Sequence, residues 1–99
     1  MAEFDYEGMD PFALYQMFCD DSRDLGGFII AMDKVVTSEA ERLYWRDRLI
    51  SVNDERRGID PNDRKAQISA MRRWRTELAD VTAILNEREA NDQASSQAG

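Results

Sequence analysis

The residue types that carry most enzyme and metal chemistry are scarce in this sequence of 99 residues, which has no histidine and one cysteine, Cys19. Without histidine there is no imidazole to serve as a general base, a metal ligand or a member of a catalytic triad. One cysteine cannot form an internal disulfide or a cysteine-rich zinc site. We therefore expect Cys19 to be a small buried residue on a helix.

Acidic residues form two clusters that could bind a cation. The first, at residues 20–24, lacks the D-x-[DN]-x-[DN]-G spacing of a calcium loop. The second, at residues 60–65, places Lys65 where such a loop needs glycine. Both clusters are better explained as helix-capping residues, and the sequence contains no glycine-rich phosphate loop. We expect a protein that is not an enzyme and that binds no metal, cofactor or small-molecule substrate.

Arg72, Arg73 and Arg75 surround Trp74, and such mixing of basic and aromatic residues is typical of nucleic-acid binding. Trp74 belongs to an apolar helical stripe, so its ring is expected in the core. Consecutive arginines point around a helix, and a net charge of −7 repels a polyanion at long range. We therefore expect these arginines to face solvent or a protein partner. Two alternatives stay open: a nucleic-acid-associated protein, or an acidic mimic of nucleic acid, because residues 1–41 hold ten acidic and two basic residues, a net charge of −8.

The first nine residues alternate acidic and large apolar side chains, among them Phe4 and Tyr6. Segments of this kind either dock as extended peptides in a partner's groove or cover the core of their own domain. Six of the nine aromatic residues lie within the first 28 positions, and an exposed aromatic group there would mark a binding surface. We keep both interpretations for an extended segment at residues 1–9.

Capping patterns predict where the helices begin and end. Asp10-Pro11 and Asp60-Pro61 each combine an N-cap acceptor with a proline at the first helical position. Ser38 followed by Glu41 forms a capping box, and Gly58 after two arginines predicts a helix end.

These patterns and the apolar spacing predict a single helical domain over residues 1–89. The predicted helices run over residues 11–21, from 22 or 24 to 36, 39–57 and 61–89. Residues 90–99 carry nothing to bury, so we expect a disordered tail that folding does not need.

Apolar residues in the last two predicted helices form matching stripes. The stripes are Trp45, Leu49 and Val52 in one helix and Met71, Trp74, Leu78, Val81 and Leu85 in the other. Folding back at residues 58–60 would make an antiparallel pair in which Leu49 meets Met71 and Trp45 meets Trp74. The predicted fold is therefore all-α: a long antiparallel hairpin of residues 39–57 and 61–89, with two short N-terminal helices packed on it.

The last predicted helix extends past its hairpin partner by about 15 Å at 1.5 Å per residue. Val81, Ile84 and Leu85 lie in this overhang, and such side chains contribute roughly 1.5–3 kcal/mol each when buried. A second apolar strip on the third helix is expected to contact the N-terminal helices; it contains Ala40, Leu43, Tyr44 and Ile50. Those helices can then reach only part of the overhang, so we expect it to bind a partner or a second copy of the chain.

These expectations favour a non-enzymatic protein–protein interaction module, such as an adaptor, an assembly or structural subunit, or a small regulator encoded by a phage or mobile element. The longest apolar run, Phe28 to Met32, is too short for a bilayer, which needs about 20 residues, and the acidic N-terminus is not a signal peptide. We expect a cytoplasmic protein, or one in the host cytoplasm if a phage encodes it, with no membrane as partner and with a protein partner or self-association favoured over a nucleic acid. The residues expected to contact a partner are Val81, Ile84, Leu85, Phe4, Tyr6, Arg72, Arg73 and Arg75.

Overall fold

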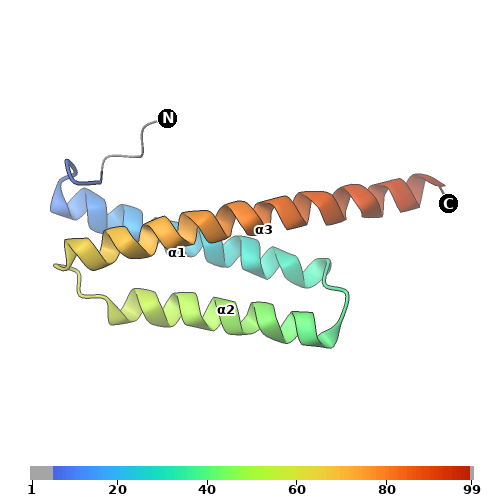
Figure 1. Ribbon diagram of the computed structural model, residues 1–99, viewed down its shortest axis with the longest axis horizontal. Coiled ribbons are helices and arrows are strands. Elements are labelled where there is room, and N and C mark those ends of the chain that lie inside the picture. The colour runs from blue at the N-terminus through green and yellow to red at the C-terminus, as the bar shows by residue number, and fades with distance from the viewer. Residues whose placement is uncertain (1–5, 99) are drawn as a thin grey trace.

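The computed structural model describes the backbone of residues 6–98 and the side chains of residues 6–91. Three long helices make up most of this part: α1 (Pro11–Ala31), α2 (Glu39–Gly58) and α3 (Arg64–Ala98) (Figure 1). A short 3-10 helix, η1 (Met32–Lys34), follows directly on α1. No strand occurs among the described residues, and the all-α prediction is confirmed.

Two of the predicted helix starts are present in the structure. The Asp10 side chain accepts hydrogen bonds from two backbone N–H groups in the first turn of α1, with Pro11 at the first helical position. Ser38 Oγ accepts from the N–H of Glu41 at 3.1 Å. These side chains satisfy N–H groups that have no partner within the helix.

The third predicted start, at Asp60-Pro61, is wrong, because these residues form a turn before α3. Within the turn, Asp60 Oδ1 accepts from the N–H of Asn62 at 2.7 Å. Asp63 then caps α3 by accepting from the N–H of Ala66 at 3.1 Å. Asp63, rather than Asp60, is therefore the residue that caps α3.

At its other end α3 is longer than predicted, since its helical backbone continues to Ala98 and the sequence predicts an end at Glu89. No proline or glycine interrupts residues 90–98, and three of them are alanine, the residue with the highest helix propensity. That folding does not need residues 90–99 stays a prediction.

The two predicted N-terminal helices are in fact one helix, α1, of 21 residues. The sequence predicts a break at Ser22 or Asp24, where a polar side chain could cap a new helix. Instead Ser22 Oγ donates to the carbonyl of Cys19 at 2.7 Å. This bond satisfies the buried hydroxyl inside a continuous helix, which Gly26 and Gly27 do not interrupt.

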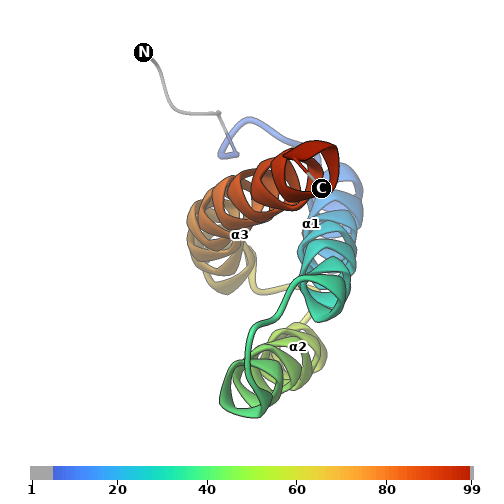
Figure 2. The same cartoon turned by 90° about the vertical axis from the view of Figure 1, so that its right-hand side faces the viewer.

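α1 lies between α2 and α3 and packs on both, whereas α2 and α3 approach each other less closely (Figure 2). The predicted close packing of the two hairpin helices on each other is therefore not confirmed, because α1 is the closer neighbour of both. Trp74 of α3 stacks on Phe18 of α1, with the ring centroids 5.1 Å apart, rather than on Trp45. Buried side chains from all three helices form one core.

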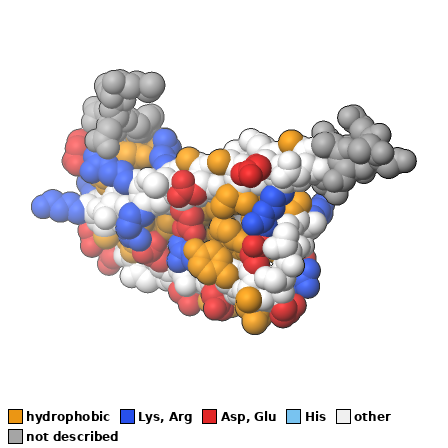
Figure 3. Space-filling model, turned by 45° about the vertical axis from the view of Figure 1, so that its right-hand side comes forward, with side chains coloured by type: hydrophobic (Ala, Val, Ile, Leu, Met, Phe, Trp, Pro, Cys, Tyr) orange, Lys and Arg blue, Asp and Glu red, His pale blue; other side chains and the backbone are white. Residues whose placement is uncertain are grey.

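α2 and α3 nevertheless run antiparallel, and long charged side chains bridge them. The bridging ion pairs are Arg48–Glu77, Arg73–Glu55 and Arg88–Glu41. Glu55 also accepts from the indole N–H of Trp74 at 2.7 Å, which places Trp74 opposite the C-terminal part of α2. On the side shown in Figure 3, acidic and basic side chains lie beside the apolar ones between these helices.

The second apolar strip of α2 does not face α1. Leu43, Tyr44 and Ile50 are 51%, 55% and 57% exposed, so the expectation that N-terminal helices cover them is wrong. We call Leu43 and Ile50, which share one side of the helix, the outer strip of α2. α1 packs instead on the face that carries Leu49. Gly26 permits this approach, because a Cβ added there would lie 3.3 Å from Leu49 Cδ1.

We predict that Gly27→Ala stabilises the protein. Gly26→Ala should stabilise it by a smaller amount or destabilise it. Alanine is favoured over glycine in a helix interior by about 0.5–1 kcal/mol, and a Cβ at Gly27 meets no atom within 4 Å. That gain raises the melting temperature of a small domain by roughly 2–8 °C, whereas a Cβ at Gly26 must displace Leu49. Thermal denaturation followed by circular dichroism measures both variants, and equal gains would contradict the close contact at Gly26.

Candidate functional site

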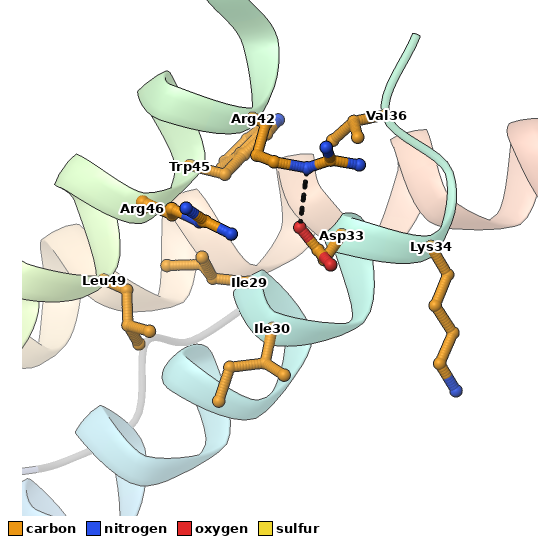
Figure 4. Close-up of a pocket in the computed structure, with 9 residues that line it drawn as sticks. All are labelled: Ile29, Ile30, Asp33, Lys34, Val36, Arg42, Trp45, Arg46 and Leu49. Atoms are coloured by element: carbon orange, nitrogen blue, oxygen red, sulfur yellow. Dashed lines mark hydrogen bonds and ion pairs between the residues drawn. The ribbon is translucent and has the colours of Figure 1, made fainter. Parts of the chain in front are cut away.

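A groove lies between the C-terminal part of α1 and the N-terminal half of α2 (Figure 4). Its volume is about 310 Å³, and we call it the α1–α2 groove. The lining side chains come from α1, η1, the loop that follows η1, and α2. They are Ile29, Ile30, Asp33, Lys34, Val36, Arg42, Trp45, Arg46 and Leu49.

The walls of the groove are mainly apolar. Ile29 is buried in the core, and Trp45 and Leu49 of α2 are half-buried against that core. Ile30, on the next position of α1, is 60% exposed. The groove is therefore a place where side chains at the edge of the apolar core are partly exposed to solvent.

The outer strip of α2 adjoins this groove. Arg46 lines the groove, and Leu43 and Ile50 lie three residues before it and four residues after it, which places them on neighbouring turns of the same side of the helix. The groove and the outer strip together form one surface that exposes several apolar side chains.

Charged residues stand at the rim of the groove. Arg42 Nε donates to Asp33 Oδ1 at 3.0 Å (Figure 4). An Arg42 nitrogen also lies 3.6 Å from the Glu39 carboxylate. Lys34 and Arg46 form no ion pair within the part of the chain that the structure describes. The rim therefore presents two positive charges that a carboxylate from outside could pair with.

The arginines expected to face a partner are engaged within the chain. Arg73 pairs with Glu55 at 2.7 Å, and Arg75 pairs with Asp21 at 3.1 Å. Burial raises the pKa of the Asp21 carboxyl, although Arg75 acts in the opposite direction. These contacts hold α3 to its two neighbours, which leaves the arginines less available to phosphates than their spacing suggests.

Tyr6 is 3% exposed and belongs to the core. The guanidinium groups of Arg72 and Arg75 lie over its ring, 5.7 Å and 5.5 Å from the centroid, within the range of a cation–π interaction. Arg64 also donates to the Tyr6 carbonyl at 3.1 Å. Tyr6 therefore covers the protein's own core, one of the two roles considered for this segment, and Phe4 lies outside the described residues.

Val81, Ile84 and Leu85 also lie against the protein's own core. Val81 is fully buried, Leu85 is 4% exposed and Ile84 is half-buried. The long α1 packs along α3, and Met32, directly after α1, is buried in the same core. The argument that an uncovered overhang needs a partner therefore does not hold for these three residues.

The acidic cluster at residues 20–24 lies inside α1 and caps no helix, contrary to expectation; Asp20 pairs with Arg23 at 3.3 Å. Cys19 is a free, half-buried thiol on the same helix. Within the described residues, no group of three or more acidic or cysteine side chains is arranged to hold a metal ion. No helix in that part of the chain is both long and apolar enough to cross a membrane.

The α1–α2 groove is a feature that the apolar stripes alone do not predict, because they assign Trp45 and Leu49 to contacts with α3. The signal in the sequence is Ile30, because it falls outside the apolar stripe that helical spacing gives this segment: Leu25, Phe28, Ile29, Met32, Val35 and Val36. Neither a protein-family model, nor a curated protein, nor a solved structure matches this chain. The functional argument therefore rests on the geometry of the groove.

We predict a pH-dependent contribution from the ion pair between Arg88 and Glu41. The hydrogen bond and charge of Arg88 hold the pKa of the Glu41 carboxyl below its ordinary value of 4.5. A carboxyl with a lowered folded-state pKa stabilises the fold above its unfolded pKa, and this stabilisation is lost as the pH falls through the folded pKa. Glu41→Gln should therefore cost about 0.5–1 kcal/mol at neutral pH and progressively less in acid.

Urea denaturation of both proteins at pH 7 and pH 3 measures this difference in the free energy of unfolding. Glu89→Gln is the matched control, because Glu89 is an exposed carboxylate on α3. An equal loss at the two pH values for Glu41→Gln would rule out the assigned role of Arg88.

Proposed function

We propose that this protein is a non-enzymatic protein–protein interaction module whose binding surface is the α1–α2 groove with the outer strip of α2. The observation that carries the proposal is the exposure of apolar side chains there. Ile30, Leu43 and Ile50 are 60%, 51% and 57% exposed. Contiguous exposed apolar surface rimmed by polar residues is typical of interaction sites.

The chemistry of the lining supports binding better than catalysis. Its one carboxylate, Asp33, is bonded to Arg42, and its other charged groups are Lys34 and Arg46. General acid–base catalysis needs a group that exchanges a proton near the operating pH. Apolar walls with a few polar groups at the rim instead resemble the anatomy of protein interfaces.

α2 is the helix that a partner would cover. Its backbone packs closely on α1 and less closely on α3, and Val52 is its only buried residue within the described chain. A partner on the outer strip would bury apolar area that contributes roughly 25 cal/mol per Å². Adaptors, assembly subunits and small regulators all act through surfaces of this kind.

We predict that Ile30→Glu and Ile50→Glu each abolish capture of the partner while the protein stays folded. Both side chains are more than half exposed in the chain alone, so the fold loses little. A buried charge at an interface lowers the binding affinity by tenfold or more, which corresponds to a loss of about 1.4 kcal/mol or more in the free energy of binding. Affinity capture from the native cell lysate, quantified by mass spectrometry, measures the loss.

Phe12→Glu is the matched control, because Phe12 is 70% exposed at the start of α1, the opposite end of that helix from the groove (Figure 1). It introduces the same charge and should leave capture unchanged. Capture that survives both isoleucine variants, or that is lost with Phe12→Glu as well, would contradict the assigned surface.

A further inference from the structure

We infer that the partner docks in the α1–α2 groove through an amphipathic helix that carries Asp or Glu beside its apolar side chains. This inference rests on the proposed function, because it names the chemistry of the partner. Three features support it: the length of the groove, its apolar walls, and two cations at its rim that pair with no carboxylate among the described side chains.

The groove is about two helical turns long. Its α2 side runs from Arg42 to Leu49, which at 1.5 Å per residue is about 10 Å. Positions i and i+7 of a docked helix are separated by the same distance, and helices bound in grooves use anchors at i, i+3 or i+4, and i+7. The volume of about 310 Å³ is small for a site that encloses a ligand, about 300–1,000 Å³, and suits a few inserted side chains.

The two walls offer apolar contacts on both sides of such anchors. Trp45 and Leu49 of α2 lie across the groove from Ile29 and Ile30 of α1 (Figure 4). An aliphatic or aromatic anchor placed between them would cover the exposed part of Ile30 and the half-buried faces of Trp45 and Leu49. Such central, desolvated contacts supply most of the binding energy of an interface.

The rim selects for negative charge on the flanks of the docked helix. Arg42 is already neutralised by Asp33 and Glu39, but Lys34 and Arg46 have no carboxylate partner among the described side chains. Arg42 and Arg46 are also like charges four residues apart on one helix, a mildly unfavourable pair. A carboxylate that joins them would relieve this repulsion, so the groove favours acidic over basic partners although the whole chain has a net charge of −7.

Two synthetic amphipathic helical peptides test the inference. Both carry leucine at i, i+3, i+4 and i+7, one with glutamate and the other with lysine on the flanks of the leucine stripe. Binding to the full-length protein is followed by anisotropy of a dye on the peptide and by tryptophan emission, because Trp45 lines the groove. We expect the glutamate peptide to bind at least tenfold more tightly, with a preference that shrinks as salt is added.

Three variants locate the binding. Lys34→Glu combined with Arg46→Glu should remove or reverse the preference for the glutamate peptide. Arg57→Glu combined with Lys65→Glu makes the same charge change at exposed residues away from the groove and should keep the preference. Trp45→Phe should abolish the emission change while anisotropy still reports binding.

Equal affinity for the two peptides, binding of neither, or loss of the preference in the control variant would overturn the inference. So would light scattering that shows a concentration-dependent dimer dissociated by Lys34→Glu with Arg46→Glu, since a second copy would then occupy the groove. If these results appear while Ile30→Glu still abolishes capture of a cellular partner, the proposed function stands and only the partner chemistry is wrong.

Discussion

Gly26 brings α1 so close to α2 that a methyl group in its place would touch Leu49, and earlier in the same helix Phe18 stacks on Trp74 of α3. One helix therefore serves as a neighbour to both of the others. The arrangement depends on α1 staying continuous through Ser22 and the two glycines, because a break there would separate the contacts with α3 from those with α2. The close contact at Gly26 is thus the constraint from which the order of the helices in space follows.

The surface of the molecule follows from this order. α2 packs on α1 with the face of Leu49 and meets α3 through long charged side chains, so its outer strip stays more than half exposed. The groove forms where α1 ends and α2 begins, because the two helices are joined there by η1 and a short loop instead of by packed side chains. The candidate binding surface therefore exists because α1, and not α3, is the close neighbour of α2.

Local chemistry made part of the fold predictable from the sequence. The caps at Asp10 and Ser38 depend on neighbouring residues only, and the structure has them. The helical spacing of apolar residues likewise predicted that the described residues would form helices and no strand. Apolar stripes identify which face of a helix is buried, but they do not identify the helix that covers it. The stripe with Trp45 and Leu49 fits α1 as well as α3, so the spacing of apolar residues could not show which helix covers each stripe. For the same reason it could not predict the burial of Val81 and Leu85 or the presence of the groove.

The three helices are joined by contacts of different chemistry. α1 meets its neighbours mainly through apolar packing, with Arg75–Asp21 as an additional ion pair to α3, whereas three ion pairs span the wider separation between α2 and α3: Arg48–Glu77, Arg73–Glu55 and Arg88–Glu41. Dissolved ions screen partly exposed charges and leave apolar contacts intact or strengthen them. Ionic strength therefore acts unevenly on this triangle: high salt weakens the attachment of α2 to α3 more than the apolar attachment of either helix to α1.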